Sequence, residues 1–212
     1  MRTKDRIVET ARVLFNEQGY GAVSVAALAS ACGIAEGNLW YHFKTRRALL
    51  DALGERFADA IETRLTLVPG GDPVAGYARL LDAIIAEFRD FRFLYRDQRS
   101  YGEHGERVAA QAPDWIERTY LQIEAHLGAL AAAGLLDWPQ ERLRDLAINS
   151  TIILRYGLDH YRELGEPTGT GTGAVRRTLL RHLTLFEYRL EVGTAAQLRA
   201  AIEVIEAEAL AA

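Results

Sequence analysis

A tyrosine and a histidine stand next to each other at Tyr41 and His42, in a stretch whose side chains could do chemistry. The stretch reads CGIAEGNLWYHFKTRR, and the basic residues Lys44 and Arg46 follow within it. Such a cluster can be an acid/base site, a metal or redox site, or a surface that lies against a polyanion. The residues alone leave these three kinds of site open, so their spacing has to decide between them.

The spacing argues against catalysis. Adjacent residues of a helix point about 100° apart, so Tyr41 and His42 cannot converge on one substrate atom without partners from elsewhere. No nucleophile or catalytic-triad motif lies near them. Elsewhere, Asp159, His160 and Glu163 come nearest to a metal-ligand pattern, but only the two carboxylates share a helix face. We therefore expect no enzyme, no metal site and no cofactor.

Composition and charge favour a soluble protein with one basic end. The 212 residues are 49% hydrophobic and 25% charged, which is ordinary for a globular chain. No run approaches the roughly 20 apolar residues of a membrane helix, and no signal peptide is visible, so we expect a cytoplasmic protein with no membrane partner. Residues 1–47 carry seven basic and four acidic groups, a net +3, whereas the whole chain carries −4. A basic head on an acidic body is typical of a chain that meets a polyanion at one end only.

Hydrophobic residues recur at helical spacing along the chain, and no strand-type alternation is convincing, so we predict an all-α fold. Gly19 should end a first helix, Ser24 should cap a second, and Thr45 should cap a fourth that runs to about Leu67. Between them, Cys32 and Gly33 form a tight turn before a short third helix. Two short helices joined by such a turn make a helix-turn-helix, whose second helix can enter the DNA major groove. We predict these DNA-binding residues, with bases facing the start of the third helix and phosphates its end: Ser24, Ala35, Glu36, Gly37, Asn38, Trp40, Tyr41, His42, Lys44 and Arg46.

These residues carry a resemblance to a known family. Ile7, Phe15, Gly19-Tyr20, Gly33-Ile34 and the run from Gly37 to Phe43 are ordered and spaced as in tetracycline-repressor (TetR) family regulators. Ala35 departs from the family by lacking a polar capping side chain, and Trp40 stands where tyrosine is usual. The resemblance covers about 50 residues, and it predicts a DNA-binding domain at 1–47 and an effector-binding and dimerisation domain at 48–212.

What the resemblance implies for the body is a homodimer and a small-molecule effector. The dimer is expected to form through two long helices, here residues 140–164 and 174–191, with interface residues Leu179, Leu183, Phe186 and Leu190. Burial of that stripe within one chain is the alternative, since periodicity cannot separate the two. Polar and aromatic residues among apolar stripes suggest an effector cavity, and the candidates are Phe88, Arg96, Tyr101, Trp115, His126, Asn149, Arg155, Tyr156 and His160.

The predicted function is a repressor that binds a palindromic double-stranded operator as a dimer. A small, apolar or aromatic molecule in the body would release it. Two alternatives stay open: an architectural or partner-controlled DNA-binding factor without an effector, and an α-helical enzyme, which would need a titratable cluster that the sequence does not display.

Overall fold

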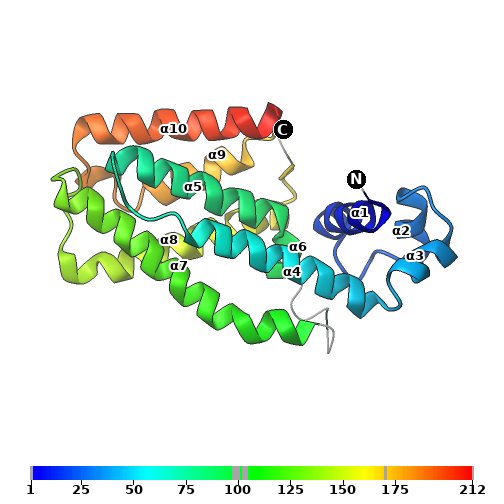
Figure 1. The fold of residues 1–212 in the computed structure, drawn as a ribbon. Helices are drawn as coiled ribbons and strands as arrows, with labels where there is room; N and C mark the ends of the chain where they lie inside the picture. Colours follow the sequence, from blue (N-terminus) through cyan, green and yellow to red (C-terminus); the bar gives the residue numbers. More distant parts are fainter. Residues whose placement is uncertain (1, 97–100, 102–104, 170, 212) are drawn as a thin grey trace. The chain divides into compact units, whose positions relative to one another are not determined.

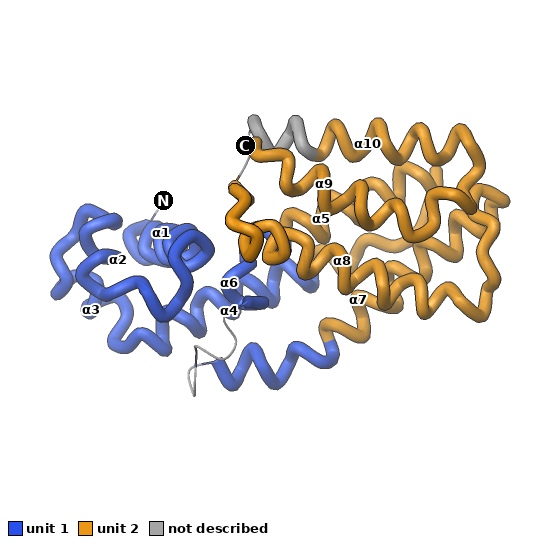
Figure 2. Tube along the Cα trace, turned by 180° about the vertical axis from the view of Figure 1, so that it is seen from behind, with its two compact units in different colours: residues 1–62, 87–114 blue, residues 63–86, 115–212 orange. Residues whose placement is uncertain are grey.

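The computed structural model describes residues 2–96, 101, 105–169 and 171–211, with side chains up to residue 205. In these ranges the chain is helical and forms no strand, as predicted; Leu136 and Leu190 make a single antiparallel bridge. The helices form two compact units, residues 1–62 with 87–114 and residues 63–86 with 115–212 (Figure 2). None of the helices in the described ranges is both long and apolar enough to cross a membrane.

The first unit begins with the trihelical head, labelled at the blue end of the chain in Figure 1. The three helices of the head are α1 (Thr3–Gln18), α2 (Val25–Ala31) and α3 (Glu36–His42), and most of α4 (Arg46–Leu65) follows them in the first unit. The end of α5 (Pro73–Asp90), α6 (Arg92–Arg96) and the start of α7 (Glu106–Ala132) complete it. Ile7 and Phe15 of α1 are at most 1% exposed and form the centre of the head's core. These two residues, which belong to the family pattern found in the sequence, therefore anchor α1 in the head.

Polar contacts join α1 to α5 and α6 within the first unit. The Asn16 side chain donates to the backbone carbonyl of Asp90 at 2.8 Å and accepts from the backbone N–H of Phe93 at 3.0 Å. In return, Arg96 donates to the carbonyls of Phe15 and Asn16 at 3.0 and 3.2 Å. Carbonyls at a helix end have no partner inside their own helix. Each of these helices therefore supplies hydrogen-bond partners to the other's end.

The second unit contains α8 (Leu143–Glu163), α9 (Ala174–Leu183) and α10 (Val192–Ala211) beside the remaining parts of α4, α5 and α7. Helix α9 packs against both α8 and α10. The approach to α8 is close at Gly157, where an added Cβ would lie 2.4 Å from the Thr178 methyl group. A glycine at this point lets the two helices come together.

Helix α9 is shorter than predicted. The sequence suggested a helix to residue 191, but α9 ends at Leu183, and a short 3₁₀ helix follows at Glu187–Arg189. The backbone N–H groups of Leu185 and Phe186 donate to carbonyls three residues back, which tightens the chain into turns and ends the helix. The apolar spacing continues through this change of structure, which is why periodicity alone overestimated the helix.

Candidate nucleic-acid interface

Local sequence signals set the geometry of the helix-turn-helix. The Ser24 hydroxyl accepts from the backbone N–H of Ala27 at 3.1 Å and caps α2, as predicted. After α2, Gly33 adopts a φ of +64°, a conformation that favours glycine, and the N–H of Ile34 donates to the carbonyl of Ala29. The chain thus turns sharply between Cys32 and Ala35, and α3 begins immediately afterwards.

Two buried side chains hold α3 in place. Leu39 is 2% exposed and Phe43 is 3% exposed, so both side chains belong to the core of the head. Ala35 precedes the helix in an extended conformation and makes no side-chain cap, which confirms the absence inferred from its residue type. The helix is therefore fixed mainly by packing of one face, and its opposite face is available for a partner.

The first turn of α3 forms an exposed surface. Ala35, Glu36, Gly37 and Asn38 are all exposed. A Cβ added to Gly37 would meet nothing within 4 Å, so packing inside the chain does not require a glycine there. These four residues are the ones predicted to face DNA bases, and the structure brings them together on one accessible helix end.

The far end of α3 presents an aromatic and cationic surface. Tyr41 is 74% exposed, and the Lys44 ammonium lies 5.7 Å from the centre of its ring. His42 is half-buried beside Tyr41. Lys4 of α1, absent from the predicted contact set, places its ammonium 5.5 Å from the Phe43 ring at the end of α3. Its position in the first turn of α1 gave no sequence signal, because only the fold brings α1 to this end of α3.

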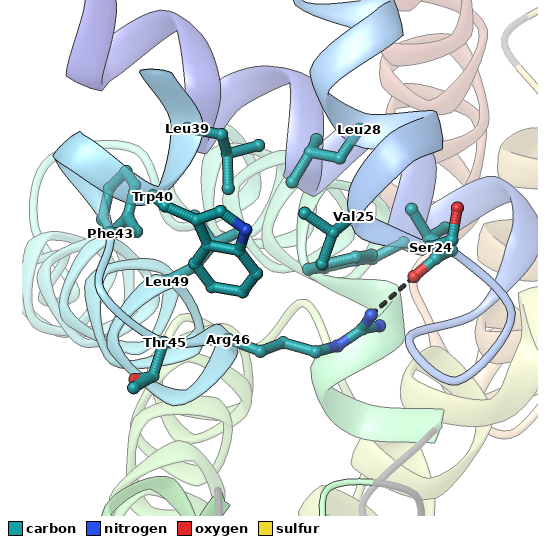
Figure 3. Close-up of a pocket in the computed structure, with 11 residues that line it drawn as sticks. Ser24, Val25, Leu28, Leu39, Trp40, Phe43, Thr45, Arg46 and Leu49 are labelled. Atoms are coloured by element: carbon teal, nitrogen blue, oxygen red, sulfur yellow. Dashed lines mark hydrogen bonds between the residues drawn. The ribbon is translucent and has the colours of Figure 1, made fainter. Parts of the chain in front are cut away.

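The Trp40 side chain is partly packed and partly accessible. It is 36% exposed, and it lines a small cavity of about 10 Å³ between α2, α3 and the start of α4 (Figure 3). That volume holds about one water molecule and no larger ligand. One part of the indole therefore packs against the head, while the rest remains accessible.

Arg46, which was predicted to lie along phosphates, makes hydrogen bonds within the head. Its guanidinium donates to the carbonyl of Val23 at 2.5 Å and to the carbonyl of Tyr20, and it stacks 4.3 Å from the Tyr20 ring centre. Figure 3 shows the side chain extended towards the turn before α2. Burial raises the pKa of Tyr20, and the Arg46 cation opposes that rise. Arg46 therefore ties the start of α4 to the α1–α2 connection, where Thr45 caps α4 by accepting from Ala48 N–H at 3.0 Å.

Comparison with known proteins identifies the family of this fold. Residues 7–53 match the model described as "Bacterial regulatory proteins, tetR family", and residues 56–197 match the TetR model described as "Bacterial transcriptional repressor". The chain belongs to the TetR family. It is a TetR-family transcriptional regulator, and the resemblance seen in its first 50 residues is confirmed.

Individual TetR relatives match parts of the chain. Tetracycline repressor protein class C of Escherichia coli is 31% identical over 94 residues, which are 44% of this chain and 41% of that protein. YerO, an uncharacterized HTH-type regulator of Bacillus subtilis, is 33% identical over 92 residues, 42% of this chain and 31% of YerO. The alignment with YerO, like that with a second Bacillus subtilis regulator, YuxN, spans only about a third of the relative's own length.

Solved TetR structures match the fold over nearly the whole chain. A TetR-family regulator from Marinobacter aquaeolei VT8 superposes with a TM-score of 0.78 at 19% identity, covering 97% of this chain and 99% of that one. CprB from S. coelicolor A3(2) superposes with a TM-score of 0.67 at 15% identity, covering 97% of each chain. At these identities the likeness concerns the fold.

The residues predicted to bind an effector in this TetR chain are divided between the two units. Phe88, Arg96 and Tyr101 belong to the first unit, where Tyr101 donates to the Phe93 carbonyl and its ring contacts that of Tyr20. Trp115 and His126 are buried in the second unit, and Arg155 is half-buried there. The remaining three are exposed on α8: Asn149, Tyr156 and His160. Exposed residues cannot line an interior cavity of one chain. The prediction that Asn149, Tyr156 and His160 line such a cavity is therefore wrong for the single chain.

The four residues predicted for the TetR dimer interface are core residues of a single chain. Leu179 and Phe186 are 0% exposed, Leu183 is 1% exposed and Leu190 is 9% exposed. Side chains with no exposed area have none left to bury against a second copy. These residues are therefore buried within one chain, which was the alternative left open by their periodicity. A dimer would have to use other residues.

A buried polar cluster in the second unit of this TetR chain was missed. Tyr77 of α5 and His182 of α9 are both 0% exposed, and the Tyr77 hydroxyl lies 2.7 Å from His182 Nε2. Burial lowers the pKa of His182 to about 3, so the ring is neutral. The sequence signal was a histidine inside the stripe formed by Leu179, Leu183 and Phe186, where an apolar residue is expected.

Proposed function

We propose that this TetR-family regulator is a dimeric repressor that binds a palindromic DNA operator through α3 and releases it when a small molecule binds its C-terminal body. The functional division is proposed at residues 1–47 and 48–212, and the site of action is the cytoplasm, where bacterial operators lie. The observation that carries the proposal is the exposed first turn of α3, held on a helix-turn-helix by buried Leu39 and Phe43.

The chemistry of that turn fits base recognition. Asn38 offers both a donor and an acceptor, the pattern that pairs with the major-groove edge of adenine, and Glu36 can accept from cytosine. Lys4 and Lys44 supply positive charge near the end of the same helix, where DNA phosphates would lie. Arg46 contributes by holding the head together.

Selection of an operator from random double-stranded DNA tests this proposal. Purified protein should enrich a palindrome whose half-sites lie about one or more helical turns apart. Asn38→Ala should then relax the preference at one base pair of each half-site, at a cost of about 1 to 3 kcal/mol in specific binding. Anisotropy titrations against the selected operator and its single-base variants measure this.

Ser30 provides a matched control, because it is exposed near the end of α2 and lies outside the first turn of α3. Ser30→Ala should keep the wild-type preference at every position. An Asn38→Ala variant with unchanged preference would contradict the proposed reading surface.

Exposed residues on α8 support a dimer through a different face from the one predicted. Ile152 is 48% exposed and Tyr156 is 52% exposed, and with Asn149 and His160 they follow the three-and-four spacing of one helix face. Large exposed apolar groups in a row are typical of interaction surfaces. We propose that this face of α8 pairs with its copy across a two-fold axis.

The end of α4 supports a route from effector to DNA. The Gln122 side chain of α7 donates to the carbonyls of Arg64 and Leu67 at 2.7 and 2.8 Å, and Arg64 donates back to Gln122 Oε1 at 2.5 Å. A shift of α7 on ligand binding would therefore carry the end of α4 with it. Because α4 begins in the head, such a shift would change the spacing of the two recognition helices in a dimer.

Operator affinity with and without a bound effector tests the route. A ligand can shift the equilibrium only by its differential affinity for the two states. Release requires a lower operator affinity of the ligand-bound protein, and equal affinities would contradict the proposed regulation.

A further inference from the structure

Three neutral polar side chains meet inside the second unit. Tyr77, Ser150 and His182 come from α5, α8 and α9, and each is 0% exposed. The Tyr77 hydroxyl is hydrogen-bonded to His182 Nε2 at 2.7 Å. Three helices that are distant in sequence thus bring hydrogen-bonding groups to one interior position.

Two atoms of this cluster have no hydrogen-bond partner. His182 Nδ1 and Ser150 Oγ are buried and unsatisfied. Ser150 lies close enough to Tyr77 to oppose the rise in the phenol's pKa that burial causes, yet its oxygen makes no hydrogen bond of good geometry. Buried polar atoms almost always have partners, because leaving one unpaired costs free energy. Their neighbours Thr151 and Thr178 follow that rule, each donating to a carbonyl of its own helix at 2.9 Å.

The surroundings of the two atoms are apolar and aromatic. The His182 ring lies 5.4 Å from the Phe186 ring, and Tyr77 lies 6.1 Å from it. Leu154 on α8 and Leu183 on α9 are at most 1% exposed. A ligand that reaches His182 Nδ1 and Ser150 Oγ would therefore meet mostly apolar surface around one polar position.

We propose that Ser150 and His182 are the polar anchor of a small-molecule site that takes a neutral, largely apolar ligand with a hydroxyl or carbonyl group. Both anchor atoms can form hydrogen bonds to a neutral oxygen. A carboxylate ligand is disfavoured, since Tyr77, Ser150 and His182 carry no positive charge to offset its desolvation. The use of this site to regulate DNA binding rests on the proposed effector function, whereas binding itself does not.

Matched probes of equal chain length test the site. Octan-1-ol and octan-2-one present a neutral oxygen, and octanoate presents a charge at pH 7.5. Calorimetric titration of the full-length protein should show binding of both neutral probes and at least tenfold weaker binding of octanoate. Ser150→Ala and His182→Phe should each weaken the neutral probes about tenfold, the expected effect of one lost hydrogen bond.

Thr151→Val is the matched control, because Thr151 is buried next to Ser150 but its hydroxyl is already paired with the Ala147 carbonyl. It should bind the probes as wild type does. The ¹⁵N resonance of His182 Nδ1 should also move on addition of octan-1-ol in wild type and in Thr151→Val. This resonance reports contact at the anchor itself, so it separates ligand contact from a general loss of packing in Ser150→Ala.

The proposal is overturned if wild type binds neither neutral probe, if octanoate binds as tightly as octan-1-ol, or if Ser150→Ala and His182→Phe both retain full affinity. Operator titrations distinguish failure of the proposed ligand site from failure of the proposed regulation. Probe binding that leaves operator affinity unchanged would keep the site and contradict its effector role. An effector that releases DNA equally from wild type, Ser150→Ala and His182→Phe would keep the regulation and overturn the site.

Discussion

Gly37 is an exposed glycine inside α3 that the packing of its own chain does not explain. Its φ is not in the left-handed region, and the space beyond its Cα is open. A glycine within a helix costs about 0.5 to 1 kcal/mol relative to alanine. Close approach to DNA would account for its presence, because a methyl group would then meet the bases.

Gly37→Ala should therefore stabilise the protein and weaken DNA binding at once. We expect a gain of about 0.5 to 1 kcal/mol in the free energy of unfolding, measured in urea, with reduced affinity for the selected operator. Gly21→Ala, at another exposed glycine with open space, should leave operator affinity unchanged. Operator affinity as high as that of wild type in Gly37→Ala would exclude the close approach.

His182 should make the fold sensitive to acid. Burial lowers its pKa from 6.5 to about 3, so the folded protein keeps the ring neutral where the unfolded chain takes up a proton. Stability from this residue is therefore present above pH 6.5 and is lost as the pH falls towards 3. At pH 5.5 the loss is about 1.4 kcal/mol relative to neutral pH.

Urea unfolding of wild type and His182→Gln at pH 7.5 and 5.5 isolates that contribution. The variant should lose about 1.4 kcal/mol less between the two pH values than wild type loses. His126, whose pKa burial also lowers, is present in both proteins and cancels in the comparison. Identical pH dependence would show that His182 does not stay neutral in the fold.

At the scale of elements, the end of α1 and the junction of α5 with α6 depend on each other. Asn16 is 9% exposed, and its side chain donates a hydrogen bond to the Asp90 carbonyl and accepts one from the Phe93 N–H. Asn16→Ala should cost roughly 1 to 3 kcal/mol of unfolding free energy, because it leaves the buried N–H of Phe93 without its partner, whereas the Asp90 carbonyl keeps a hydrogen bond from Arg12. Amide exchange at Phe93 should accelerate in the same variant.

Gln18→Ala is the control for that change, since Gln18 is exposed in the same last turn of α1. It should stay within about 0.5 kcal/mol of wild type. If Asn16→Ala were equally mild, the polar contacts between α1 and α6 would not be stabilising.

Short-range signals predicted the elements of the head well. Ser24, Thr45 and Gly19 act through neighbours a few residues away, so their capping roles followed from residue type. Arg46 shows the limit, because its partners Tyr20 and Val23 are brought to it only by the fold. The same limit explains Leu179 and Leu183: periodicity showed that their stripe is buried, but could not show which helix covers it.

For the whole molecule, the outer face of α8 should decide the oligomeric state. Ile152→Glu would place a charge at the centre of the proposed two-fold interface, and sedimentation should show a shift from dimer to monomer. Operator affinity should fall with it, since a monomer binds only one half-site.

Leu121→Glu is the matched control, because Leu121 is 53% exposed on α7 and is comparable in size. It should leave the protein dimeric. A monomeric wild type, or a dimeric Ile152→Glu, would contradict pairing through this face.

Helix α3 and the two residues that flank it, Ala35 and Phe43, combine two groups of side chains that evolution can treat separately. Leu39 and Phe43 are buried and hold the helix in the head, while Ala35, Glu36 and Asn38 are exposed. Substitutions at those exposed positions should change little in the fold, so under the proposed base contacts a lineage can acquire a new target sequence without first acquiring spare stability. A duplicated copy of such a gene could move to a different promoter in a few single-residue steps, each one still a folded protein.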